Sequence, residues 1–253
     1  MIQRRAFSAA LATGTAAALL GHAEAADAAR NVVLVHGAFA DGSSWSEVIG
    51  QLQAAGLNVT SVQNPLTSLA DDVEATRRAL ALQDGPTVLV GHSWGGTVIT
   101  EAGDDPKVCA LVFVAARAPD VGEDYTALAA KFPKPPASAG IVRVGGFAQL
   151  SEAAFLDHFA GGVERAKARV LYAVQGRIAD TLFASKTTVA AWRRKPCWYA
   201  ISKQDKTTAP ELQRFLAKRM RATTIELDSS HLSLVTHPKE ITTLILSAAA
   251  RSS

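Results

Sequence analysis

The sequence lacks the features that mark several classes of protein. It has two cysteines in 253 residues, no internal repeat, and 26 lysines and arginines against 23 aspartates and glutamates. This near balance of charge gives no reason to expect a nucleic acid or another polyanion as partner, and the one tight basic run, residues 192–195, fits a solvated connection between elements. No group of histidines and cysteines has metal-ligand spacing, so neither a metal nor an organic cofactor is expected.

The first 25 residues have the pattern of an export signal. Arg4 and Arg5 precede an apolar stretch, residues 6–20, and Ala23-Glu24-Ala25 has the small-x-small form of a cleavage site. The segment around the two arginines resembles a twin-arginine signal, and an ordinary secretory signal is the alternative. The apolar stretch is too short and alanine-rich for a membrane span. We therefore expect a periplasmic or secreted protein of residues 26–253, with no stable membrane insertion after cleavage.

The most informative motif is Gly91-His92-Ser93-Trp94-Gly95. It follows the apolar run Val88-Leu89-Val90 and precedes a helix-like stretch, residues 96–102. A serine on a sharp strand-to-helix turn presents its Oγ above the sheet, and the flanking glycines let crowded backbones approach. The pattern predicts a nucleophilic Ser93 on such a turn.

An acid and then a histidine follow the serine in the chain, which is the order used by enzymes whose nucleophilic serine lies on a turn of this kind. Asp205 lies in the loop after a predicted strand, residues 197–202, and His231 follows another, residues 223–227. Both loops leave the carboxyl ends of their strands, so the three side chains can meet at one edge of a parallel sheet. Asp120, which follows the predicted strand 110–114, is a rival for the acid, whereas Asp228 is expected to cap its own loop.

The strand 32–35 runs into His36-Gly37-Ala38-Phe39, which is typical of the first half of an oxyanion hole. We expect the backbone N–H groups of Ala38 and Trp94 to stabilise a developing oxyanion. His36 and His92 flank these turns, and both are interpreted as buried, hydrogen-bonded structural histidines.

On these residues the chain resembles the α/β-hydrolase superfamily, most closely its small esterase branch of plant methyl-salicylate-type esterases, hydroxynitrile lyases and bacterial relatives. The resemblance runs from about residue 31 to the C-terminus and is carried by four motifs: Val35-His36-Gly37-Ala38, Gly91-His92-Ser93-Trp94-Gly95-Gly96, Ala116-Arg117-Ala118-Pro119-Asp120 and Ser230-His231-Leu232. It implies a mostly parallel central sheet flanked by helices, with Ser93 as nucleophile, His231 as base and Asp205 as acid. The lyases carry threonine in place of Gly37 and lysine in place of Leu232, so cyanohydrin cleavage is not expected.

Cys109 and Cys197 each begin a predicted strand. In the sheet order of the superfamily these strands are neighbours, which would bring the two thiols to the same end of the sheet. A disulfide is one possibility for an exported protein, and two reduced, buried side chains are the other.

Residues 119–196 interrupt the strand–helix alternation and are predicted to form a helical and loop-rich cap over the site. A short amphipathic helix, residues 151–159, is expected there, capped by Ser151. Aromatic residues from the cap and from the two active turns are the candidate pocket walls: Phe39, Trp94, Phe132, Phe147, Phe155 and Phe183. No arginine or lysine stands out as a ligand for a carboxylate, so an apolar, mostly neutral substrate is expected.

Together these features predict a single-domain serine hydrolase that cleaves small to medium carboxylic esters with apolar or aromatic groups. Amide, lactone or pyrethroid-like ester cleavage would use the same groups, as would cofactor-free perhydrolysis of the haloperoxidase type. A ligand-binding protein on a hydrolase scaffold is a further alternative, against which the complete set of three residues argues. The sequence carries no prediction of oligomeric state.

Overall fold

Six parallel strands form the central sheet. The computed structural model describes residues 28–251, so the predicted export signal lies outside the described residues. The strands run in the order β2-β1-β3-β4-β8-β9. Their bounds are β1 Asn31–Val35, β2 Asn58–Val62, β3 Thr87–His92, β4 Val108–Val114, β8 Cys197–Ser202 and β9 Thr223–Leu227. The predicted mostly parallel sheet is confirmed, and β1, β3 and β8 are buried along their whole length, as expected of strands covered on both faces.

The strand order reverses its direction between β1 and β3. From β1 the chain moves outward to β2 and then returns to the other side of β1, where β3 pairs with it in parallel register from Asn31↔Thr87 to Val35↔Gly91. A crevice forms outside the carboxyl ends of two strands at such a point, and ligands of open parallel sheets bind there. The loop after β1 and the turn after β3 both enter this crevice.

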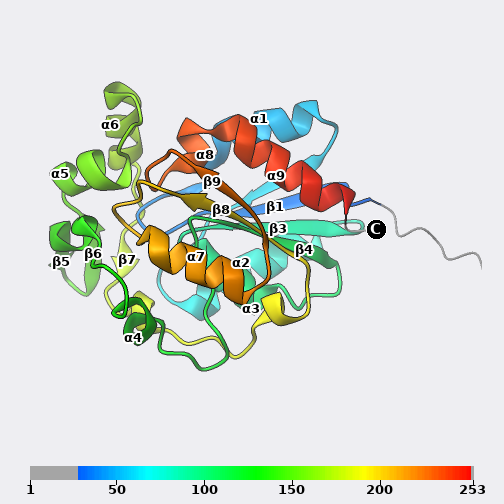
Figure 1. Ribbon diagram of the computed structural model, residues 1–253, viewed down its shortest axis with the longest axis horizontal. Helices are drawn as coiled ribbons and strands as arrows, with labels where there is room; N and C mark the ends of the chain where they lie inside the picture. Colours follow the sequence, from blue (N-terminus) through cyan, green and yellow to red (C-terminus); the bar gives the residue numbers. More distant parts are fainter. Residues whose placement is uncertain (1–27, 252–253) are drawn as a thin grey trace, which may run out of the picture.

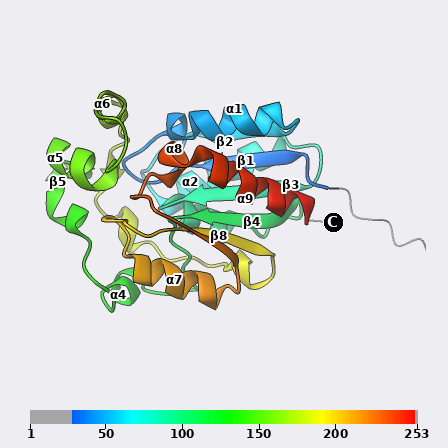
Figure 2. The ribbon, with the colours of Figure 1, turned by 45° about the horizontal axis from the view of Figure 1, so that its top comes forward.

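Helices cover both faces of the sheet, and two pairs of them pack against each other. In one pair α1 (Ser46–Ala54) lies beside α9 (Pro238–Ala250), and in the other α2 (Leu69–Ala81) contacts α3 (Gly95–Ala102). Figure 2 shows α1 and α9 along one side of the strands, with the short α8 (Ser233–Thr236) next to them. α7 (Pro210–Arg219) packs on β8 at the opposite side. No helix among the described residues is long and apolar enough to cross a bilayer.

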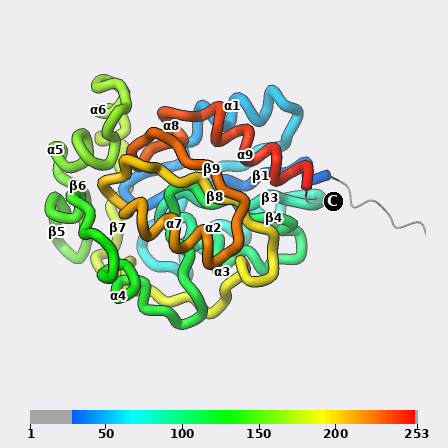
Figure 3. Tube along the Cα trace, in the orientation of Figure 1, coloured from blue at the N-terminus to red at the C-terminus, as the bar shows by residue number. Residues whose placement is uncertain are grey.

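The middle part of the segment between β4 and β8 gathers at one end of the molecule, opposite the C-terminus (Figures 1 and 3). Its elements are α4 Tyr125–Ala129, β5 Ile141–Val144, β6 Phe147–Leu150, α5 Glu152–Ala154, α6 Arg165–Ala173 and β7 Ile178–Ala179. Ser151 caps α5 as expected, through its Oγ and the Ala154 N–H, and a single π-helical turn, Phe155–Phe159, continues that helix. We call the segment from α4 to β7 the cap.

The expectation of a helical and loop-rich cap is incomplete, because β5, β6 and β7 form an antiparallel sheet. The turn between β5 and β6 is Gly145-Gly146, with φ values of +59° and +80°. Glycine reaches this left-handed region without strain, and two such residues make the tight turn that matches the twist of a hairpin. The Gly-Gly pair between two short β-branched or aromatic runs was the signal that could have predicted this hairpin.

Both cysteines are free thiols. β4 and β8 are neighbours, but Cys197 pairs with Leu111 in the sheet, two positions beyond Cys109. Each Sγ is directed to a backbone carbonyl, Cys109 to Thr87 and Cys197 to Lys195, both at 3.2 Å. Burial raises the pKa of the Cys197 thiol to about 12, so it stays protonated at neutral pH. Of the two alternatives, the structure contains the reduced pair.

Candidate active site

Ser93 occupies the sharp turn between β3 and α3. Its φ of +51° lies in the left-handed region, which is rare for a residue with a side chain and marks a constrained turn. The turn is fixed by the neighbouring strand, because Ser93 N–H donates to Val114 O (3.1 Å) and Ser93 O accepts from Arg117 N–H (3.0 Å). A Cβ at Gly91 would lie 2.6 Å from Gly95 O, so this position tolerates only glycine. The sequence motif and the observed turn therefore agree.

Asp205 and His231 are joined by a hydrogen bond in the interior. Asp205 follows β8 and His231 follows β9, and the distance from His231 Nδ1 to Asp205 Oδ2 is 2.7 Å with both side chains fully buried. The other carboxylate oxygen accepts the N–H groups of Thr207 (2.7 Å) and Thr208 (2.9 Å). These bonds fix the carboxylate, which in turn holds the imidazole with Nε2 as its free nitrogen.

Gln213 is a fourth member of this cluster, and sequence reasoning missed it. It lies on α7, is fully buried, and donates from Nε2 to Asp205 Oδ2 at 2.8 Å while its Oε1 accepts the Ser202 N–H at 3.0 Å. No local pattern marks a glutamine in an amphipathic helix as a partner of a distant loop. Its position one helical turn inside α7, which begins just after the Asp205 loop, is the only sequence clue.

His231 lies against the residue that precedes Ser93. The His92 and His231 rings are 4.7 Å apart between centroids, and His92 Nε2 is 3.1 Å from His231 O. His231 Nε2 has no hydrogen-bond partner among residues 28–251, and no hydrogen bond joins it to Ser93 Oγ. Bonds of this type often close only when substrate is bound. Burial holds the pKa of His92 well below its usual value, so its imidazole is neutral beside His231.

The loop after β1 comes within contact distance of Ser93. A Cβ on Gly37 would lie 2.8 Å from Ser93 Cβ, so only glycine allows this approach. Within the described part of the chain, the backbone N–H groups of the next residue, Ala38, and of Trp94 have no hydrogen-bond acceptor. Two free donors therefore lie beside the Ser93 turn, one of them at the N-terminus of α3.

His36 is a structural residue, as the sequence indicates. Its Nδ1 donates to Gly37 O (2.8 Å), and its Nε2 accepts the Asn64 N–H (2.9 Å). Burial lowers the pKa of His36, which keeps the ring neutral and able to accept that bond. The ring thereby ties the loop after β1 to the chain after β2.

The two other aspartates have different roles. Asp120 binds Arg193 through both carboxylate oxygens at the surface, and the Arg193 hydrogen bond lowers the pKa of Asp120. It has no contact with His231. Asp228 was expected to cap its own loop, but it is largely exposed and forms an ion pair with Lys203 at 2.8 Å. Neither competes with Asp205 as the partner of the histidine.

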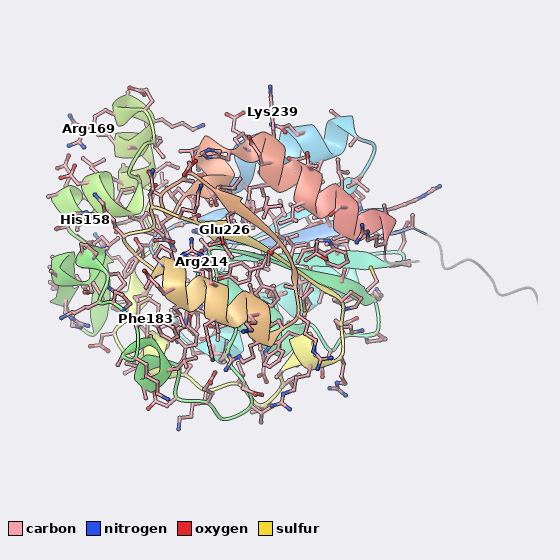
Figure 4. The ribbon with its side chains drawn as sticks, viewed as in Figure 1. His158, Arg169, Phe183, Arg214, Glu226 and Lys239 are labelled. Carbon is pink, nitrogen blue, oxygen red and sulfur yellow. The ribbon has the colours of Figure 1, made fainter. Side chains whose placement is uncertain are left out.

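An apolar cavity of about 300 Å³ opens at Ser93. Phe39 and Phe183 line it as expected, with their rings edge to face at a centroid distance of 6.0 Å (Phe183 is labelled in Figure 4). The π-helical turn contributes Phe159, whose ring also lies 5.1 Å from that of His231. Further walls come from the cap, from α7 and from the loop before it: Tyr125, Ala129, Pro133, Pro135, Ile141, Leu150, Ala209 and Leu212.

Four expected wall residues lie elsewhere. The Trp94 ring is fully buried under the site, where its Nε1 donates to Asp72 at 2.7 Å. Phe132 packs on Phe215, and Phe155 packs between Phe159 and Tyr172. Phe147 begins β6, the middle strand of the cap sheet, and is 43% exposed. The three cap residues share one cause, because the sequence does not reveal which face of a cap element turns inward. Trp94 lies on the Ser93 turn instead, and its ring is bound to Asp72 away from the cavity.

A model of the alpha/beta hydrolase family matches residues 32–243, and the chain belongs to this family. A carbendazim-hydrolyzing esterase of Nocardioides sp. (strain SG-4G) is 34% identical over 147 residues, which cover 52% of this chain and 57% of that protein. Methylesterase 7 of Arabidopsis thaliana is 36% identical over 109 residues, which cover 36% of this chain and 42% of that protein. The chain thus spans about half the length of these curated relatives. The solved structure of polyneuridine aldehyde esterase shares the fold, with a TM-score of 0.75 at 19% identity over 87% of this chain and 98% of that one.

Proposed function

We propose that the protein is a serine hydrolase that cleaves small to medium carboxylic esters through an acyl-enzyme. Membership of the alpha/beta hydrolase family supports the reaction class, and the esterase names of the matched relatives support an ester as substrate. In this proposal Ser93 is the nucleophile, His231 the general base and Asp205 the acid that orients His231.

One observation carries the proposal. A serine in a constrained left-handed turn opens into an apolar cavity, and a histidine held by a buried carboxylate lies beside that turn with its second nitrogen free. The hydrogen bond to Asp205 fixes the proton on Nδ1, so Nε2 can accept the proton of Ser93 Oγ. Oγ then attacks the ester carbonyl, His231 returns the proton to the leaving alcohol, and water releases the acyl group by the same path.

The backbone N–H groups of Ala38 and Trp94 are assigned to the oxyanion. The assignment is supported by the lack of an acceptor for either group among residues 28–251 and by the close approach of the Gly37 backbone to Ser93. Fixed donors at the point where negative charge develops need no rearrangement during the reaction, and one such donor contributes about 10² to 10³ in kcat.

The shape of the cavity favours an acyl or alcohol group of modest size. About 300 Å³ holds a small molecule, and most of the wall is aliphatic, prolyl and aromatic side chains. Burial of apolar substrate surface there supplies binding free energy of about 25 cal/mol per Å². Esters with apolar or aromatic groups therefore fit best.

The proposal is tested with p-nitrophenyl esters of increasing acyl length and the mature protein. We expect hydrolysis with an optimum at short to medium chains, and loss of nearly all turnover in Ser93→Ala. Ser247→Ala is the matched control: this serine lies on α9 and bonds only to Leu244 O, so activity is retained. Covalent labelling of the wild type with a fluorophosphonate, located by mass spectrometry of its peptides, identifies the reactive serine, and circular dichroism shows whether Ser93→Ala is folded. Labelling of the wild type at a residue other than Ser93, or equal turnover by Ser93→Ala, would refute the assignment.

A further inference from the structure

The cavity wall contains a buried arginine. Arg117 follows β4, its backbone N–H binds Ser93 O at 3.0 Å, and it lines the same cavity as Ser93. The residue is only 7% exposed. A cation thus lines a mostly apolar pocket that also contains the proposed nucleophile.

Aromatic rings surround the guanidinium. Its carbon lies 4.1 Å from the centroid of the Tyr125 ring, 5.1 Å from that of Trp94 and 5.3 Å from that of Phe183. Ring faces attract a cation and keep it flat against them. They leave the in-plane N–H groups, which form the donor fork, available for hydrogen bonds.

Those donors are largely unused. Nη2 donates to Phe183 O at 3.3 Å, whereas Nε is buried and has no partner among residues 28–251. The hydroxyl of Tyr125, from a neighbouring wall residue, is also buried without a partner in that part of the chain. Buried donors are normally satisfied, so a guanidinium with unused donors in the wall of a cavity favours a ligand that accepts hydrogen bonds from the part of Arg117 that lines it.

Arg117 also has no acidic partner among the described residues, unlike other arginines of the fold. Arg219, which is partly buried, pairs with Glu123 at 2.7 Å, and Arg214 pairs with Glu226 between α7 and β9 (Figure 4). Burial lowers the pKa of Arg117 only to about 10, so it remains a cation at neutral pH. A buried charge without a counterion is costly, and a carboxylate offers the strongest compensation.

We infer that Arg117 determines specificity by binding a carboxylate of the substrate, so that the preferred substrates are esters with an apolar body and one free carboxylate. The inference rests on the proposed ester hydrolysis, and it replaces the expectation of a mostly neutral substrate with that of an anionic one. Half-esters of dicarboxylic acids have this chemistry. Ser93 Oγ attacks the ester carbonyl, the acyl C–O bond breaks, and the alcohol leaves with the proton held by His231; water then cleaves the acyl-enzyme and releases a dicarboxylate and a proton.

The test compares two series of methyl esters in the wild-type protein at pH 7. One series is the monomethyl esters of straight-chain dicarboxylic acids, and the other is the methyl esters of monocarboxylic acids with the same number of carbons. At the chain length that spans Ser93 and Arg117, we expect kcat/KM to be about 10- to 100-fold higher for the anionic ester, because a hydrogen-bonded charge pair is formed in a buried site.

Three variants test whether Arg117 causes the preference for the anionic ester. Arg117→Gln removes the charge and lowers the anionic-to-neutral ratio of kcat/KM to one or below. Arg117→Lys keeps the charge without the planar fork and retains part of the ratio. Arg78→Gln removes the same charge from the exposed face of α2, where Arg78 pairs with Glu74, and leaves the ratio unchanged.

Each result has a distinct meaning. A wild type that hydrolyses the neutral esters as fast as the anionic ones at every chain length overturns the role of Arg117 and leaves the proposed ester hydrolysis intact. An equal loss of kcat/KM for both series in Arg117→Gln also overturns it, because Arg117 then only supports Tyr125 and Phe183. No hydrolysis in either series, together with no labelling of Ser93, refutes the proposed function itself. Since the wild-type comparison needs no variant, a misfolded Arg117→Gln does not prevent a decision.

Discussion

Replacement of Asp205 by asparagine tests the proposed catalytic cluster most sharply. All four partners of the carboxylate are donors: the N–H groups of Thr207 and Thr208 at Oδ1, and Gln213 Nε2 and His231 Nδ1 at Oδ2. An ionised carboxylate can satisfy all four, whereas an amide has one accepting oxygen and one donating NH₂. One pair of donors must therefore lose its acceptor.

The geometry decides which pair is affected. The two backbone N–H groups belong to a turn and cannot rotate, so the asparagine oxygen takes the position of Oδ1 and its NH₂ faces His231. His231 Nδ1 must then accept, which moves the ring proton to Nε2 and removes the base from Ser93. This wrong tautomer lowers kcat by about 10⁴-fold, equivalent to about 5 kcal/mol of transition-state stabilisation, with little change in KM.

The assay is the steady-state hydrolysis of a p-nitrophenyl ester, with circular dichroism to confirm folding. Asp120→Asn is the matched control, because it loses only an ion pair with Arg193 on the surface. Activity of Asp205→Asn within tenfold of the wild type, or an Asp120→Asn variant as inactive as Asp205→Asn, would show that the tautomer argument is wrong.

Two further predictions concern stability. Gly96→Ala places a Cβ against the backbone oxygen of Arg117 and lowers the free energy of unfolding by about 3 kcal/mol. Gly50→Ala, in the exposed middle of α1 with free space around it, raises the free energy of unfolding by about 0.5 to 1 kcal/mol. Urea denaturation of both variants measures the contrast, and equal effects would contradict the packing argument. His36 and His92 have lowered pKa values in the folded state, so they bind protons more readily when unfolded, and their contribution to stability is present above pH 6.5 and is lost as the pH falls below it. The urea midpoint should therefore decrease as the pH is lowered from 7 to 5, and it should decrease less in His36→Asn. The same decrease with pH in both proteins would show that His36 is not its cause.

The sequence predicts the core of the site because its signals are local. The strands that precede Asp205 and His231 have the predicted bounds, Cys197–Ser202 and Thr223–Leu227. A short, continuously apolar run that ends in a glycine-flanked serine can form few structures other than a strand and a sharp turn. The rules of parallel sheets then bring the loops after such strands to one edge.

The walls of the cavity depend on contacts that no local pattern encodes. Phe155 and Phe159 are one helical turn apart, yet only Phe159 reaches the cavity, because Phe155 packs between Phe159 and Tyr172 of α6. Arg117 belongs to a motif that carries the family resemblance, but its burial depends on the rings of Tyr125 in α4 and of Phe183. Long-range packing of this kind requires the tertiary structure.

The contacts that fix the Ser93 turn and those that form the cavity wall come from different parts of the chain. Val114, Arg117 and the loop after β1 fix the turn from the sheet alone, while most of the cavity wall comes from one uninterrupted stretch of chain, residues 125–183. The proposed reacting groups and the proposed selective surface are thus encoded in different parts of the gene. In the proposed esterase, a replacement or insertion within that stretch would change which ester fits without moving Ser93, so new substrates are accessible through exchange of a single segment, with Arg117, which precedes it, as the fixed residue.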